Sequence, residues 1–390
     1  MAVNKFDNSM LDAGTIGTTA NKLLQLDGSA KIPAVDGTLL TGIPSSFTKS
    51  ASDPVITTNP SGGVGTIWIN TTSGETYCCT DATAGENIWT NVGAGSGNIK
   101  PYSFQGSNYG YFYGSTIPAR NGIEKVSLTS DGNSTDVGEQ STHRNAYTAN
   151  TSPTHGYCCG GNSGTDVIDK FLFTAEGTMT DVGNLALARA YCSGQSSQTH
   201  GYVSGGAGSP IGNQIDRFSF STDGNATDWA DLSFGRNGWC GANSLTHGYH
   251  AGGWYNGPFS DVIDKFPFAS QTNATDVGNL LAIMNQNSGA CSLTYGYSIG
   301  GYTPSPSNII QKWSFTTDGN STDVGDLTLA RFCGASCSST THGFMAGGDS
   351  GAGGTPSNVI DKWSFVSDAN ATDVGDMTTV GNYMGLGSQY

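Results

Sequence analysis

Positive charge is scarce in this sequence. Only 16 of the 390 residues are Lys or Arg, against 31 Asp and Glu, which gives a formal net charge of −15. Six of those 16 basic residues recur at one position of a repeated motif: Lys125, Lys170, Arg217, Lys265, Lys312 and Lys362. No basic stripe is left for a phosphate backbone, so we expect no nucleic-acid binding and no attraction to anionic membranes.

Long apolar segments are also missing. No stretch approaches the roughly 18 consecutive apolar residues of a transmembrane helix. The first residues, Met1 to Asn8, have neither the basic start nor the apolar run of a signal peptide. We therefore expect no membrane insertion, and assembly of the protein in a cytoplasm.

The nine cysteines lack the spacing of a disulfide framework or a zinc site. Their number is odd, no Cys-x-x-Cys occurs, and the pairs Cys78-Cys79 and Cys158-Cys159 are adjacent. We predict free thiols buried as small hydrophobic side chains. The sequence also lacks a nucleophile elbow, a P-loop and a dinucleotide fingerprint, so it predicts no catalytic residue, no metal and no cofactor.

Glycine is abundant, with 57 residues, and it marks a six-residue pattern that recurs six times. One copy reads Gly-Tyr-Val-Ser-Gly-Gly. The copies start at Gly110, Gly156, Gly201, Gly248, Gly296 and Gly343, which are 46, 45, 47, 48 and 47 residues apart. A fixed period of this length is typical of repeat architectures.

Each repeat contains four short segments with the composition of β-strands. The third segment alternates apolar and polar residues, as in Ile215 to Phe220, and the fourth reads Thr-Asp-Val-Gly or a close variant. Asp-Gly-Asn turns between these two segments predict tight hairpins. Four strands in about 47 residues, with a Gly pair ending the second strand, resemble a kelch-type β-propeller blade. The Trp usual in the fourth strand of that family is absent, since the large aromatics lie in the third strand.

The resemblance covers residues 101–390 and implies an all-β fold with a six-bladed propeller. The C-terminal stretch Gly381 to Gly387 looks like another first strand, which would complete the blade whose other strands lie near Tyr109. That arrangement would remove free sheet edges.

Residues 1–48 have a different character. The phrase from Gln25 to Pro44 spaces apolar pairs between Asp-Gly turns, and so short a segment cannot bury this surface alone. It resembles the N-terminal attachment and trimerisation segment of bacteriophage tail fibres. The resemblance implies a homotrimer joined to other virion tail proteins through residues 1–48. The alternative is a disordered leader.

Residues 49–100 predict a small β module followed by a Gly/Ser linker. Trp68, Tyr77 and Trp89 are candidate sugar-stacking residues, because aromatic faces pack on the apolar faces of sugars. The alternative, which we favour, is that so small a module needs the same three aromatics as its core.

Three sets of polar residues recur with the repeat, and we interpret all three as residues that form or stabilise turns. Their members are the Thr-His-Gly histidines 155, 200, 247 and 342, the aspartate pairs 131/136, 223/228 and 318/323, and the Asn-x-Thr asparagines 133, 225, 273, 320 and 370. Repetition disfavours a catalytic carboxylate pair, which needs one unique site. Calcium at the aspartates stays open as the less favoured alternative, and Tyr295 interrupts any ring of histidines.

The connection between the second and third segments varies most between repeats. In a propeller these connections share one end of the ring, where variable loops on a rigid scaffold commonly carry binding residues. Our candidate ligand-binding residues are Trp254, Tyr255, Phe259 and Tyr302, with a glycan as the expected ligand. The alternative is that loop length drifts where it is tolerated.

Together these patterns suggest a virion tail-fibre protein that binds a host-surface glycan or protein. A second hypothesis is a structural fibre, collar or decoration component without a receptor. A third is a glycosidase or lyase, for which the irregular acids Glu139 and Glu176 would have to meet inside the ring mouth.

Overall fold

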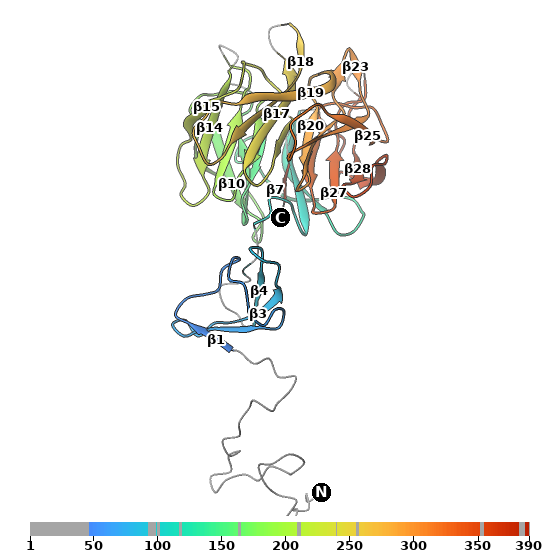
Figure 1. Ribbon diagram of the computed structural model, residues 1–390. Helices are drawn as coiled ribbons and strands as arrows, with labels where there is room; N and C mark the ends of the chain where they lie inside the picture. Colours follow the sequence, from blue (N-terminus) through green and yellow to red (C-terminus); the bar gives the residue numbers. More distant parts are fainter. Residues whose placement is uncertain are drawn as a thin grey trace, which may run out of the picture. The chain divides into compact units, whose positions relative to one another are not determined.

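The computed structural model describes residues 47–92, 99, 102–116, 119–162, 165–208, 212–238, 240–254, 257–351, 355–381 and 387–389. The expected all-β class is confirmed, and no helix occurs among these residues (Figure 1). The chain divides into two compact units, Met1–Pro101 and Tyr102–Tyr390. The predicted attachment segment lies outside the described residues except for its last two positions.

The first unit contains one four-stranded sheet in the order β1-β2-β3-β4. Its strands are β1 (Phe47–Ser50), β2 (Ile67–Asn70), β3 (Thr76–Asp81) and β4 (Ile88–Asn91). The edge strand β1 pairs parallel with β2, and the other two pairings are antiparallel.

The second unit contains six four-stranded antiparallel sheets, named here sheet one to sheet six. Sheet one is β30 (Ser388–Gln389), β5 (Tyr109–Thr116), β6 (Ala119–Ser127) and β7 (Thr135–Glu139). Sheet two is β8 (Thr148–Thr151), β9 (His155–Cys159), β10 (Val167–Leu172) and β11 (Thr180–Asn184). Sheet three is β12 (Ser193–Ser196), β13 (His200–Ser204), β14 (Gln214–Ser219) and β15 (Thr227–Asp231).

The remaining sheets follow the same order. Sheet four is β16 (Gly241–Asn243), β17 (His247–Trp254), β18 (Phe259–Pro267) and β19 (Thr275–Met284). Sheet five is β20 (Ser288–Cys291), β21 (Tyr295–Ile299), β24 (Ile309–Ser314) and β25 (Thr322–Asp326), with an inserted hairpin of β22 (Tyr302–Thr303) and β23 (Ser305–Pro306). Sheet six is β26 (Ala335–Ser338), β27 (His342–Ala346), β28 (Val359–Ser364) and β29 (Thr372–Asp376).

Glycine of the repeated pattern makes room for the aromatic residue of the next strand. A Cβ atom added to Gly343 in β27 would lie 2.1 Å from Cζ2 of Trp363 in β28. The Gly pair that ends the second strand has φ values that side chains rarely adopt, 65° and 115° at Gly205 and Gly206. The pattern therefore sets both the packing and the end of each second strand.

Consecutive sheets pack through their first strands. Strand β8 contacts β12, and the series continues through β16, β20 and β26; β26 then contacts β5 and β30 of sheet one. A C-terminal strand does complete sheet one, but it is Ser388–Gln389, paired with Tyr111 and Gly110 of β5. Most of the stretch where the sequence placed that strand, residues 382–386, lies outside the described residues.

Ion pairs join neighbouring sheets at the repeated basic position. In four of the pairs, a lysine of the third strand binds an aspartate in the hairpin turn of the following sheet: Lys170–Asp223, Lys265–Asp318, Lys312–Asp368 and Lys362–Asp131. Lys125 binds Glu176 in the same way. The pair Lys362–Asp131 joins sheet six to sheet one.

Arg217 is the exception, because sheet four offers no aspartate at that turn. Its guanidinium lies 3.6 Å from the ring centroid of Trp229, which replaces the valine found in the other Thr-Asp-Val-Gly copies. A cation–π contact thus takes the place of the ion pair.

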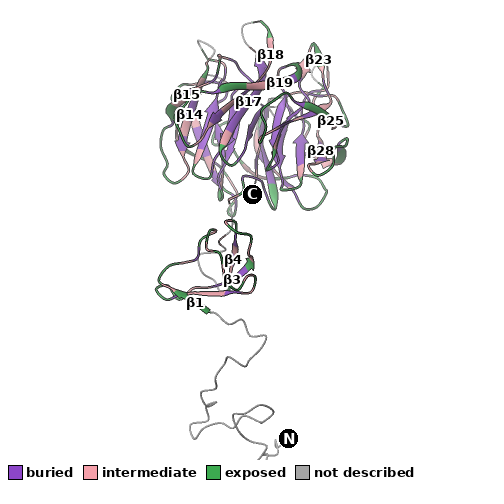
Figure 2. Ribbon diagram, viewed as in Figure 1, coloured by how far each residue is buried: buried purple, intermediate pink, exposed green. Residues whose placement is uncertain are grey.

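The turn asparagines also connect sheets, a role that the sequence did not indicate. Each side-chain Oδ1 accepts a hydrogen bond from a backbone N–H at the end of the preceding sheet's fourth strand, as from Asn184 to Asn225 and from Asp376 to Asn133. The same bond forms at the other three: Asn273, Asn320 and Asn370. Buried strand residues, purple in Figure 2, fill the space between the sheets.

Candidate functional site

Three of the predicted loop residues lie at the end of the second unit that carries the variable connections. Trp254 ends β17 and lies opposite Phe259, the first residue of β18. Its backbone exchanges two hydrogen bonds with Asn237, at 3.0 and 2.7 Å between N and O. Tyr255 lies outside the described residues. The tip of β18 and the hairpin at β23 both stand at the top of the unit in Figure 1.

Aromatic rings continue from this tip across two further sheets. The rings of Phe259 and Tyr302 meet edge to face with their centroids 6.4 Å apart, and those of Tyr302 and Phe332 do so at 5.2 Å. All four residues, Trp254 included, are half-buried, so part of each side chain remains accessible. We call Trp254, Phe259, Tyr302 and Phe332 the aromatic track.

The sequence analysis missed Phe332, which lies on the connection into sheet six and not on a loop between second and third strands. It stands opposite Asp349, just as Asn237 stands opposite Trp254 and Asn285 opposite Tyr302. An alignment of the repeats at this connection would have shown it as an aromatic residue where other repeats have asparagine or alanine. The track thus combines two kinds of connection from sheets four, five and six.

Phe332 of the track also belongs to an apolar patch formed by the connections into three sheets. Phe332 and Tyr191 pack against Ala146, Ala190 and Cys333, which come from the connections into sheets two, three and six. One position of this connection has φ between 55° and 58° in four of the repeats. The residues at that position are Ala146, Tyr191, Gln286 and Cys333. Four non-glycine residues held in this disfavoured region indicate that the surrounding contacts fix the backbone.

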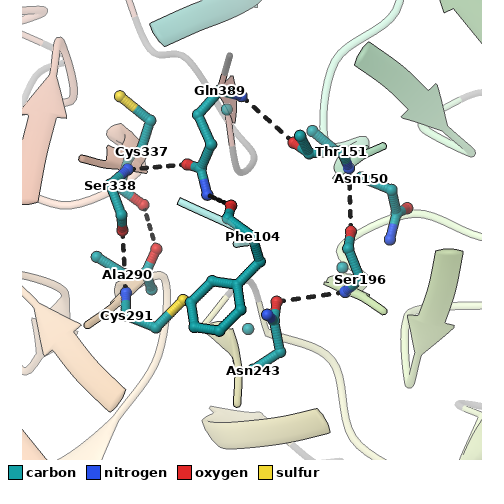
Figure 3. A pocket seen from close by; sticks show the side chains of 16 residues that line it. Phe104, Asn150, Thr151, Ser196, Asn243, Ala290, Cys291, Cys337, Ser338 and Gln389 are labelled. Carbon is teal, nitrogen blue, oxygen red and sulfur yellow. Dashed lines mark hydrogen bonds between the residues drawn. The ribbon is translucent and has the colours of Figure 1, made fainter. Parts of the chain in front are cut away.

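Between the first strands lies a small cavity of about 40 Å3, drawn in Figure 3. Side-chain oxygens and backbone N–H groups link the first strands around it: Thr151 N donates to Ser196 Oγ, Ser196 N to Asn243 Oδ1, Cys291 N to Ser338 Oγ, Ser338 N to Gln389 Oε1 and Gln389 N to Thr151 Oγ1. The ring of Phe104 enters the cavity (Figure 3). The remaining room suits roughly three water molecules and no organic ligand.

Phe104 belongs to a segment that the sequence analysis passed over. Gln389 Nε2 donates to Phe104 O at 2.6 Å, and Gln105 Nε2 donates to Ser339 O at 2.7 Å. The start and the end of the unit are therefore bonded together beside the cavity.

The sugar-stacking candidates of the first unit pack against one another. Tyr77 and Trp89 have no exposed surface, and Trp68 lies edge-on to Trp89 with ring centroids 5.8 Å apart. The indole of Trp68 also donates to Ser52 O at 2.9 Å. These aromatics form the core of the module, as the alternative interpretation had it, because a sheet of four short strands has little else to bury.

The repeated histidines bond their own turns. In each Thr-His-Gly, the Thr Oγ1 and His Nδ1 atoms lie 2.8 or 2.9 Å apart. Burial, and then the neighbouring Lys or Arg, lowers the pKa of His155, His200, His247 and His342. They come from four separate sheets. Among the residues that the structure describes, no group of three or more His, Cys, Asp or Glu is arranged to hold a metal ion.

The two aspartates of each turn pair differ in their contacts. Asp131, Asp223 and Asp318 hold the lysines between sheets. In two of the three pairs the Oδ1 atom of the second aspartate accepts the N–H of the glycine two residues later, at 3.3 Å for Asp136 and 3.1 Å for Asp323.

The two irregular acids make different contacts. Glu176 binds Lys125, whereas Glu139 Oε2 accepts a hydrogen bond from Asn121 at the other end of sheet one. Glu139 lines a hollow of about 140 Å3 together with Arg120, Glu124 and Asp136. Glu124 is already engaged there by Ser134 and Thr378.

All nine cysteines are free, and all but Cys78 are buried. Burial raises the pKa of Cys158 to about 11 and that of Cys240 to about 12. Such thiols are poor nucleophiles and pack as small apolar side chains.

No protein-family model matches the chain, and a search of characterised proteins gives no significant match. Within the described part of the chain, the structure has no helix long and apolar enough to cross a membrane.

Proposed function

We propose that this protein is a bacteriophage tail-fibre protein whose second unit is a six-bladed, kelch-like β-propeller that binds a host-surface glycan. Six sheets, each built mainly from one repeat, favour the propeller. Contacts from β26 to β5 and β30, together with the Lys362–Asp131 ion pair, favour a closed ring of blades. Radial packing of blades leaves only short, protected strand edges.

The aromatic track is the observation that carries glycan binding. It lies on the variable connections of sheets four and five and on the connection into sheet six, and variable connections can change their ligand contacts without loss of the scaffold. Half-buried rings held by neighbours offer a rigid apolar surface, and such surfaces stack on the apolar faces of sugars at little entropic cost. The small central cavity offers no comparable site.

Attachment to the virion rests on residues 1–48, whose apolar pairs and Asp-Gly turns resemble those of phage fibres. In this proposal they form a homotrimer and contact other tail proteins, so that each fibre displays three propellers. Three linked sites can hold a surface whose single-site affinity is weak.

The test is competition of phage adsorption by the purified full-length chain. We expect the native chain to bind host cells and to block adsorption, and the double variant Trp254→Ala/Tyr302→Ala to do neither. Tyr109→Ala is the matched control, since Tyr109 is 37% exposed at the opposite end of β5 from the variable connections. If the native chain neither binds nor competes, receptor binding is wrong and the structural virion component becomes the better hypothesis.

A further inference from the structure

The described cations of the second unit are almost all engaged within the protein. Five lysines bind carboxylates between sheets, and Arg217 stacks on Trp229. Four arginines are buried against aspartates of third strands: Arg144–Asp169, Arg189–Asp216, Arg236–Asp264 and Arg331–Asp361. Arg120 is exposed, but it lies in sheet one beside Glu124 and Glu139.

Among the residues that the structure describes, the surroundings of the aromatic track therefore carry no available positive charge. The nearest buried cations, Arg236 and Arg331, bind Asp264 and Asp361 at 3.0 Å with no side-chain exposure. Asp349, opposite Phe332, is the charged residue closest in register, and its Oδ1 accepts N–H groups of Gly351 and Thr355. Asp261 lies two residues after Phe259 in β18. The local charge is thus zero or negative, on a chain of net charge −15.

We propose that the aromatic track takes a neutral glycan, one without carboxylate, sulfate or phosphate groups. This inference rests on the proposed glycan-binding function and specifies its substrate class. A sugar acid would bring its charge to a surface without a counter-charge, and the protein's own field would repel it. Stacking of a neutral pyranose on Trp254, Phe259 and Tyr302 needs no counter-charge.

Binding that depends on stacking alone is insensitive to salt. Charge-driven binding weakens steeply when the Debye length falls from about 10 Å at 0.1 M salt to about 3 Å at 1 M, whereas stacking does not depend on that length. Salt dependence therefore reports on the ligand class independently of the sugar sequence.

The experiment measures binding of the full-length chain to a glycan array at about 0.1 M and about 1 M salt. The array carries neutral oligosaccharides of hexoses, deoxyhexoses and N-acetylhexosamines beside uronate-, sialate- and phosphate-bearing counterparts, with dextran and dextran sulfate as a matched polymer pair. We expect binding to neutral members only, unchanged by salt. In Trp254→Ala/Tyr302→Ala we expect it to weaken at least about tenfold, as for aromatic hot spots. Phe259→Asn is a second variant at the loop tip, and Tyr109→Ala is the control.

The outcomes distinguish the preference for neutral glycans from glycan binding itself. Binding confined to acidic members, or lost at high salt, overturns the neutral class and leaves glycan binding intact. Binding that survives in both track variants places the site elsewhere and overturns the inference. No binding to any member overturns the inference and the glycan-binding function together.

Discussion

The buried Arg–Asp pairs show how single residues are matched across the repeat. Arg331 reaches from the connection before sheet six to Asp361 in β28, and it also donates to Met345 O at 3.1 Å. Burial lowers the pKa of Arg331, and Asp361 opposes that shift. In sheet five the same two positions are Met284 and Gln311, so both partners change together. A buried charge without its partner is costly, which accounts for the joint replacement.

The paired replacement predicts how stability changes when the sheet-five residues are introduced at Arg331 and Asp361. Asp361→Gln alone leaves Arg331 buried and unpaired, and we expect it to lower the free energy of unfolding by about 3–5 kcal/mol. The double variant Arg331→Met/Asp361→Gln removes both charges and should recover most of that loss. Chemical denaturation of both variants measures the difference. If the double variant is no more stable than the single one, Arg331 and Asp361 are not energetically coupled.

At the scale of elements, each second strand is shaped by the aromatic residue of the third. The ring of Trp363 lies over the backbone of Gly343, and Phe218 lies in the same way over Gly201. The two strands pair directly at these positions. The conserved spacing of the Gly-Tyr segment within this chain is therefore a packing requirement between neighbouring strands.

Adding one methyl group beneath that ring should strain the sheet. Gly343→Ala would place Cβ 2.1 Å from Trp363 and is expected to cost about 1–3 kcal/mol, as in other overpacked cores. Gly351→Ala is the matched control, because nothing lies within 4 Å of its added Cβ. Thermal unfolding of the two variants measures the difference. Equal stability would mean that the indole moves aside at no cost.

At the scale of the whole molecule, both ends of the second unit lie beside the central cavity. Gln389 donates to Phe104 O and accepts from Ser338 N at 2.8 Å, while Ser388 pairs with Tyr111. The last two residues of β30 thus bond to sheet six, to β5 and to the Phe104 segment. Contacts between residues this far apart in the chain cost loop-closure entropy before they stabilise the fold.

Gln389 should consequently affect global stability far more than an ordinary C-terminal residue. Gln389→Ala removes two side-chain hydrogen bonds of about 1 kcal/mol each and leaves Ser338 N without a partner, so we expect a loss of about 2–4 kcal/mol. Gln198→Ala, at an exposed turn, should change stability by less than about 0.5 kcal/mol. Urea unfolding followed by tryptophan fluorescence distinguishes the two; an unchanged midpoint for Gln389→Ala would contradict the role given to this end.

The histidines predict a loss of stability on acidification. Their pKa values in the folded protein are lower than the ordinary 6.5, first through burial. Burial places the pKa of His250 well below that value too. Below about pH 6.5 the unfolded chain therefore binds protons that the folded chain does not, so stability is full above that pH and falls as the pH drops towards the folded-state values.

The measurement is the denaturation midpoint between pH 7.5 and 5.5, a window set by the ordinary histidine pKa of about 6.5. Replacing the four Thr-His-Gly histidines by tyrosine, which sheet five already has as Tyr295, should flatten the slope. A slope as steep as that of the native protein would assign the acid sensitivity to other groups.

The strands and their repetition could be predicted from the amino-acid sequence, because alternation, turn residues and the Gly pattern act between neighbours within one repeat. Loop variability, which is visible without coordinates, also made Trp254, Phe259 and Tyr302 candidates. Which of these side chains contact one another depends on how the sheets pack.

Side chains from different repeats come together only when the sheets pack. Phe332 joins Tyr302 from the next sheet, and Phe104 reaches Gln389 across 285 positions of the chain. Tyr77 and Trp89 were candidate sugar-binding residues in the sequence, and their complete burial places them in the core. Accessibility and long-range contact depend on the packed whole, so no local pattern could have supplied them.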